Sequence, residues 1–201
     1  SQGFLLDDKM IMEVSITIHR TVGVGIIISL RDFAEPNETC DVCLIVECKR
    51  IHVAKAVLAT ISPVLKTMLY GKFEESAKRE IEIHDVKHTD FVNFLNVVYS
   101  SLHAIDDASV EGILSIADRF NAKIILEAVE AFILGNSQMH IAKKLLLTDT
   151  YKLEITQAAL LLSCKNLRYT KSMELTEWYT SFSDKLKGQI CDRMMEIMGD
   201  S

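Results

Sequence analysis

The chain has 201 residues, of which 22 are Lys or Arg and 28 are Asp or Glu, so its formal charge is −6 with neutral histidines. Such an acidic chain lacks the basic surface that is typical of general nucleic-acid-binding proteins. Hydrophobic residues (49%) and charged residues (25%) have ordinary globular proportions, and the two prolines are too few for long disordered stretches. The length predicts one or two domains that fold without disulfide or metal support.

Five cysteines occur at scattered spacing, which does not fit a disulfide framework. We therefore expect reduced thiols in a cytoplasmic or nuclear protein. The longest uncharged apolar stretches, 21–30 and 155–164, hold about ten residues each, too few to cross a bilayer, and no signal peptide is visible. Since the chain begins at Ser1 and its first methionine is Met10, we expect a processed chain or a fragment of a longer one.

Alternation of apolar and polar residues with period two predicts strands at 12–18, 40–48 and 80–83. Residues 22–30 predict a further strand or an extended arm, and 31–39 predict a connector, where we place a domain boundary. A lone edge strand exposes unpaired backbone. The first strand is therefore expected to pair with the arm, with the sheet that follows, or with a second subunit.

A hairpin and then a series of helices are expected after the boundary. The turn is predicted at Lys49-Arg50, with residues 51–53 as the returning strand. Ser62 is a good N-cap and Pro63 fits the first position of a helix that Gly71 stops, and a short helix precedes it. Periodic apolar positions predict further helices that begin near Thr89, Asp106, Asn121 (as a cap), Ser137, Leu153, Ser172 and Ser183 (as a cap). This order favours an α+β fold with an all-helical C-terminal part over alternating βαβ units.

Few residues point to catalysis or metal binding. Cys40 and Cys43 have the spacing of half a zinc site, but neither a second such pair nor a later histidine pair completes four ligands. In a strand they would point to opposite faces, so we interpret them as packed thiols. The histidines and the Gly23-x-Gly25 pair match no catalytic or dinucleotide-binding motif, although a Ser–His–Asp set that meets only in space stays open. We predict no metal, no cofactor and no enzyme activity.

One aromatic residue among carboxylates indicates a protein contact. Phe73 stands next to Glu74 and Glu75, two residues after the helix stop at Gly71. A large apolar residue flanked by acids on a surface turn is typical of an interaction site. The alternative is that this acidic stretch is simply a solvated face.

An ordered set of residues extends over 40–134. Its members are Asp41-Val42, 51–59, Ser62-Pro63-Val64-Leu65, Met68-Leu69, 71–76, Ile81-Glu82-Ile83, Asp85-Val86, Phe91, Phe94-Leu95, Tyr99, Leu114, Ala117-Asp118, Phe120 and 130–134. This set, about half of the chain, resembles a BTB/POZ domain, which implies a small sheet flanked by α-hairpins. Ala54 departs from the family, which often has His there, and leaves Lys55 to supply the polar contact with Asp41.

The resemblance implies a protein that binds other proteins, since BTB domains dimerise and often dock a cullin scaffold. Cullin-binding members carry an apolar-x-Glu motif after the Ser-Pro helix, and here that motif is Phe73-Glu74-Glu75. Phe73 and Glu75 are therefore the best contact candidates, with Tyr70 and Glu74 beside them. The implied partners are a cullin of the third type and a second BTB protein, in a homodimer or heterodimer, but neither nucleic acid nor membrane.

The flanks resemble MATH-BTB adaptors of cullin-RING ubiquitin ligases, most of all nematode members. Residues 1–36 look like the end of a MATH domain, 37–135 like the BTB domain, and 136–201 like a helical extension whose first helices lengthen the cullin contact. We therefore expect a substrate-adaptor-type protein that docks a cullin and self-associates. The alternative is a BTB homo- or hetero-oligomerisation protein without ligase function.

Overall fold

The computed structural model describes residues 31–71, 80–99, 104–166 and 176–199. The strand predicted at 12–18 and the arm at 22–30 lie outside these ranges, as does the start of the helix predicted at Ser172.

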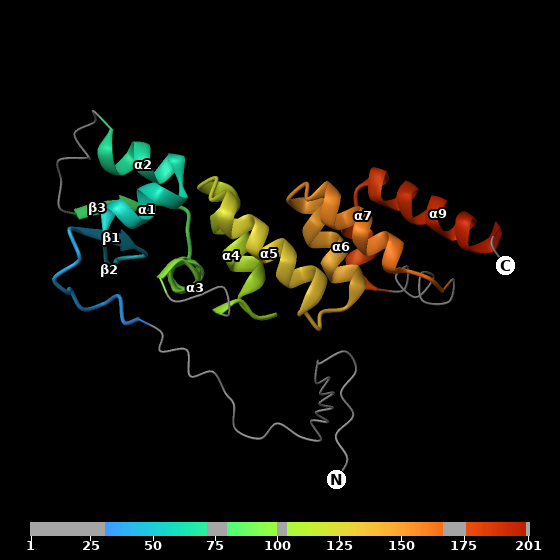
Figure 1. The fold of residues 1–201 in the computed structure, drawn as a ribbon, viewed down its shortest axis with the longest axis horizontal. Coiled ribbons are helices and arrows are strands. Elements are labelled where there is room, and N and C mark those ends of the chain that lie inside the picture. Colours follow the sequence, from blue (N-terminus) through green and yellow to red (C-terminus); the bar gives the residue numbers. More distant parts are fainter. Residues whose placement is uncertain (1–30, 72–79, 100–103, 167–175, 200–201) are drawn as a thin grey trace, which may run out of the picture.

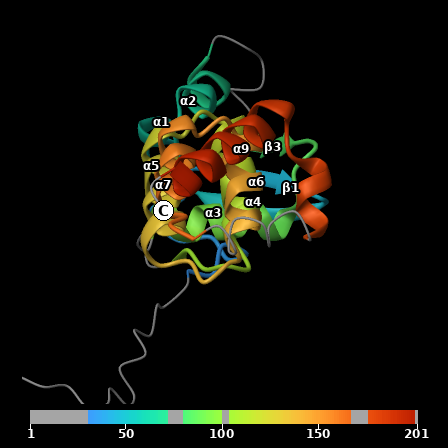
Figure 2. The same cartoon turned by 90° about the vertical axis from the view of Figure 1, so that its right-hand side faces the viewer.

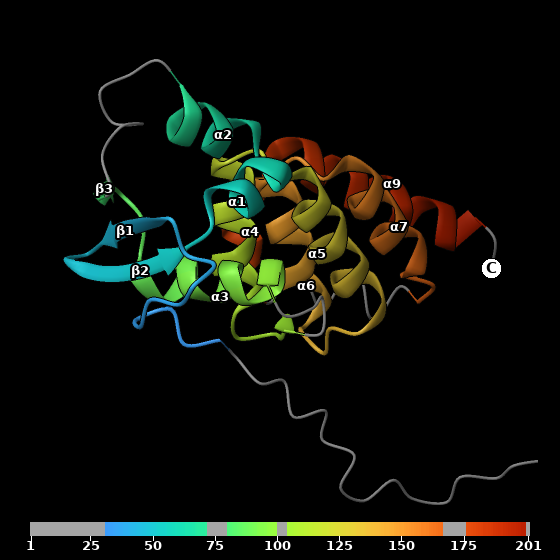
Figure 3. The same ribbon diagram turned by 60° about the vertical axis from the view of Figure 1, so that its left-hand side comes forward.

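A mixed sheet of three strands forms one end of the molecule (Figure 1). Strands β1 (Val42–Val46) and β2 (Lys49–Val53) make an antiparallel hairpin, and β3 (Glu80–Ile83) pairs in parallel with β1, which gives the order β2-β1-β3. Leu44 of β1 lies opposite Ile51 and Ile81, and all three side chains are buried. This row of buried apolar side chains anchors the sheet in the core. In Figure 3, helices α1 and α2 lie above the sheet and α3 lies below it.

The predicted turn at Lys49-Arg50 is wrong. These residues open β2, and the turn is formed by Glu47 and Cys48, with φ of 47° and 61°. Positive φ at both central residues is the pattern of a type I′ turn, which matches the twist of a two-residue hairpin. The chain adopts it without the glycine or asparagine that would have marked it in the sequence.

Helices make up the rest of the fold and confirm the α+β class. They are α1 (Lys55–Ile61), α2 (Pro63–Tyr70), α3 (His88–Tyr99), α4 (Val110–Arg119), α5 (Lys123–Gly135), α6 (Ile141–Thr150), α7 (Glu154–Ser163), the 3₁₀ helix η3 (Glu177–Ser181) and α9 (Asp184–Gly199). Neighbours pack as α1 with α2, α3 with α4, α4 with α5, and α6 with α7. Together they form a row from the sheet to α9 (Figure 1), which Figure 2 shows from its C-terminal end.

Two predicted helix starts are wrong. Asn121 has φ of 50° and follows the end of α4 in the left-handed conformation common after helices, so it does not cap α5. Ser137 is buried before α6, which instead begins after His140, whose Nδ1 accepts a hydrogen bond from the Ala142 N–H (3.2 Å). The caps predicted at Ser62 and Ser183 are confirmed.

The helices after α5 pack firmly on those before them. One cluster of buried apolar side chains runs from Phe33 to Ile190. Polar contacts add to it, because Lys143 pairs with Glu111 (3.4 Å) and the buried Thr156 hydroxyl donates to the Glu130 carboxylate. The helical extension therefore shares a core with the part that contains the sheet.

Candidate protein-interaction surface

Tyr70 is the one predicted contact residue that the structure describes. It ends α2 and is 55% exposed. Phe73, Glu74 and Glu75 lie outside the described residues, which resume at β3. Both neighbours of this segment, α2 and β3, lie at the same end of the molecule (Figure 1).

Helix α2 is fixed to the core through its first turn. The Ser62 hydroxyl accepts a hydrogen bond from the Leu65 N–H (2.9 Å) and donates one to the Phe120 carbonyl after α4. Leu65 is fully buried, whereas Val64 beside it is 44% exposed. Buried contacts therefore hold helix α2 in place, while the side chains of Val64 and Tyr70 are exposed to solvent.

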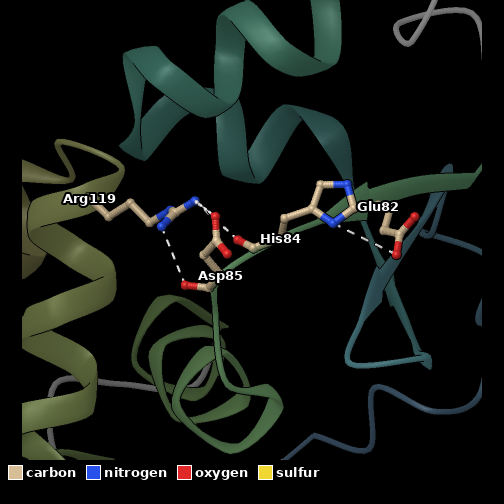
Figure 4. A network of polar contacts seen from close by, with 4 residues as sticks. All are labelled: Glu82, His84, Asp85 and Arg119. Atoms are coloured by element: carbon tan, nitrogen blue, oxygen red, sulfur yellow. Dashed lines mark hydrogen bonds and ion pairs between the residues drawn. The ribbon is translucent and has the colours of Figure 1, made fainter.

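One arginine binds the link between β3 and α3 to α4. Arg119 donates to the carbonyls of His84 (3.0 Å) and Asp85 (3.3 Å), and it lies 3.8 Å from the Asp85 carboxylate (Figure 4). Asp85 has a φ of 55°, so the chain turns sharply there. His84 Nδ1 lies 3.8 Å from the Glu82 carboxylate. Since these charges are largely exposed, they set the path of the link and add little stability.

A groove of about 690 Å³ opens beside this link. It is lined by Asp85, Val86, Lys87, Asp90, Ala108, Glu111, Gly112, Ser115, Ile116, Asp118, Arg119 and Tyr151. Four carboxylates face two basic groups, so the groove is acidic. Gly112 allows Asp90 to lie close to α4, since a Cβ on Gly112 would stand 2.5 Å from Asp90 Oδ1. The groove suits a partner that offers a basic side chain.

The two cysteines of the C-x-x-C pair do not lie together in a strand. Cys40 precedes β1, so the prediction of opposite strand faces is wrong, and both cysteines line one cavity of about 470 Å³. Burial raises the pKa of the Cys43 thiol, while Cys40 Sγ lies 3.2 Å from Asn37 Oδ1. Within the described ranges, no three His, Cys, Asp or Glu side chains are grouped so as to hold a metal ion. None of the helices in those ranges has both the length and the apolar character to span a membrane.

Comparison with known proteins decides the family. Residues 30–137 match the BTB/POZ domain. The chain is a BTB/POZ domain protein. The resemblance found in the ordered residues of 40–134 is thereby confirmed, and so is the fold class.

The relatives of this BTB protein include longer nematode proteins. BTB and MATH domain-containing protein 36 of Caenorhabditis elegans is 31% identical over 198 residues, which are 98% of this chain and 62% of that protein. BTB and MATH domain-containing protein 38 of the same species is 25% identical over 198 residues, 98% of this chain and 51% of that protein. The chain thus spans only part of the length of these relatives.

Kelch-like proteins of vertebrates match less of the chain than these two nematode proteins do. Kelch-like protein 40 of Xenopus laevis is 30% identical over 138 residues, 69% of this chain and 21% of that protein. The solved BTB domain of human gigaxonin gives a TM-score of 0.41 at 20% identity, over 47% of this chain and 77% of that one.

The role of Arg119 and the groove were not predictable from the sequence. The two carbonyls that Arg119 binds lie 34 and 35 positions earlier in the chain. No local pattern connects residues so far apart. The one available signal was the excess of carboxylates around Asp85, which also fits an ordinary solvated surface.

Proposed function

We propose that this BTB protein docks a cullin scaffold of the third type and serves as a substrate-adaptor-type module of a ubiquitin ligase, without catalysis of its own. The observation that carries the proposal is the position of the apolar-x-Glu motif. Phe73-Glu74-Glu75 follows the exposed end of α2, a helix that buried contacts hold in place. In this proposal Phe73 fills a pocket on the cullin, and Glu75 fixes the register.

The acidic groove supports a second contact with the same partner. It begins at Asp85, two positions beyond the end of β3, and includes Tyr151, which follows α6. A basic side chain on the cullin would be attracted by the excess of carboxylates. Through Tyr151, the helical extension, 136–201, would thereby contact the cullin.

Residues 1–36 were predicted to be the end of a MATH domain; since the BTB match begins at residue 30, we propose that the residues before it, 1–29, are the end of a substrate-recruiting MATH domain. The alignments with the two nematode BTB and MATH domain-containing proteins cover 98% of this chain, and so extend well beyond the BTB match on both sides. Self-association, which is common among BTB domains, is part of the same proposal and is measured by light scattering.

The test is a calorimetric titration with the N-terminal domain of the third cullin. The double variant Phe73→Ala, Glu75→Arg is expected to bind at least about 30-fold more weakly, because truncating an interface anchor costs about 2 kcal/mol or more. A matched control makes the same kinds of change elsewhere, with Met195→Ala on α9 and Glu127→Arg on α5, both exposed. The control is expected to bind as the unchanged chain does.

Two results would contradict the proposal. One is no heat of binding with the unchanged chain. The other is equal binding by the double variant and its control. A chain that self-associates in light scattering but gives no cullin binding would instead be an oligomerisation protein without ligase function.

A further inference from the structure

The segment before β1, residues 31–41, lies on the core; we call it the strap. Phe33 is 3% exposed, and its ring meets the Tyr99 ring edge to face with centroids 5.5 Å apart. The Phe33 carbonyl accepts a hydrogen bond from the His52 N–H of β2 (2.8 Å). At the other end of the strap, the Asp41 carboxylate accepts one from the first amide of α1 (2.7 Å). The strap is therefore tied down at both ends.

Arg31 begins the strap and makes contacts of its own. Its guanidinium carbon lies 4.6 Å from the centroid of the Tyr99 ring and 5.3 Å from that of Phe33, both within the range of cation–π attraction. Its Nη2 donates to Cys40 Sγ at 2.9 Å. The Tyr99 hydroxyl in turn accepts from the Ala54 N–H (2.9 Å), directly before α1. The arginine thus rests on a ring that is itself held by the core.

We propose that Arg31, Phe33 and Tyr99 form a clasp that fixes the point at which the N-terminal sequence enters the BTB domain. Two aromatic faces and a sulfur atom hold the guanidinium, and a backbone hydrogen bond holds the residue two positions later. The strap is then held in one position on the core and does not act as a flexible linker. One consequence rests on the proposed function: a recruiting domain before residue 31 would be attached at a constant place relative to the cullin surface.

Trypsin tests the clasp directly, because it cleaves after an arginine whose side chain is free to enter the pocket of the protease. The initial cleavage rate at the Arg31–Asp32 bond of the full chain is measured by mass spectrometry. A synthetic peptide of residues 27–37, with the same sequence around the bond, gives the rate for an unclasped arginine. We expect the bond to be cut at least about tenfold more slowly in the protein, since cutting requires local opening.

Two variants distinguish the contribution of the Tyr99 ring from that of its hydroxyl. Tyr99→Leu removes the aromatic face and is expected to bring cleavage close to the peptide rate. Tyr99→Phe keeps the face and is expected to stay slow. Cleavage after Arg193, in the middle of α9, monitors the overall fold and should not change in either variant.

The clasp is refuted if the unchanged protein is cut at the peptide rate, or if folded Tyr99→Leu is cut as slowly as the unchanged protein. The comparison of unchanged protein with peptide decides even where Tyr99→Leu does not fold. Neither measurement involves a cullin, so failure of the clasp leaves the proposed function standing, and loss of cullin binding leaves the clasp standing.

Discussion

Replacing Ser62 by alanine tests how the proposed interaction surface is supported. Ser62 is 0% exposed, and its hydroxyl both caps α2 at the Leu65 N–H and donates to the Phe120 carbonyl. Loss of a helix N-cap costs about 0.5–2 kcal/mol. A buried carbonyl left without its donor costs about 1–3 kcal/mol more. We expect Ser62→Ala to lower the free energy of unfolding by about 2–4 kcal/mol.

Urea unfolding followed by circular dichroism measures this loss. For a chain of this length, a loss of about 2–4 kcal/mol corresponds to a fall in Tm of roughly 4–16 °C. Ser115→Ala, at an exposed position of α4, is the control and should change the free energy of unfolding by less than about 0.5 kcal/mol. A loss below about 1 kcal/mol for Ser62→Ala would refute the reasoning, because the two hydrogen bonds would then not support α2.

Three more predictions follow from particular contacts. Gly112→Ala would place a Cβ 2.5 Å from Asp90 Oδ1 and 3.0 Å from its Cβ, so we expect a loss of about 1–3 kcal/mol in urea unfolding that adding Asp90→Ala partly restores. The hydrogen bond from the Ser109 hydroxyl is the largest cause that holds the pKa of Asp106 below its usual value of 3.8. The Asp106 carboxylate therefore stabilises the folded state fully at pH values above its pKa in the unfolded chain. This contribution is lost as the pH falls through the lower pKa of the folded state. Ser109→Ala should therefore raise the pKa of Asp106 in a carbon-13 NMR titration, and an unchanged pKa would remove the hydroxyl as its cause. Cys164 is fully buried and burial raises its pKa, so a thiol reagent should modify it at least about 100-fold more slowly than the two exposed cysteines, and equal rates by mass spectrometry would contradict this.

Features set by chemistry within one turn were predictable from the sequence. Ser62-Pro63 marks the start of α2 because an N-cap and a proline at the first helical position act within a few residues. Ser183 caps α9 in the same way, through the Leu186 N–H at 3.2 Å. The alternation of 80–83 predicts β3, whose Ile81 and Ile83 are buried.

Features set by distant partners were not predictable in this way. Ser137 looks like a cap, yet it is buried before α6, and the amide of the next residue, Gln138, donates to the distant Asp107 carboxylate (2.9 Å). The groove likewise joins the link at Asp85 to Tyr151, which lies beyond α6. Only folding brings such residues together, whereas the apolar-x-Glu motif at Phe73 is continuous in the sequence and was visible there.

The row of helices also separates the two ends of the molecule. Helix α9 ends at Gly199, on the far side from α2 and β3 (Figure 1). A foreign binding domain fused after α9 would therefore leave the proposed cullin surface uncovered. For the engineering of adaptors that bring a chosen target to a ligase, this end of the fold is the natural point of attachment.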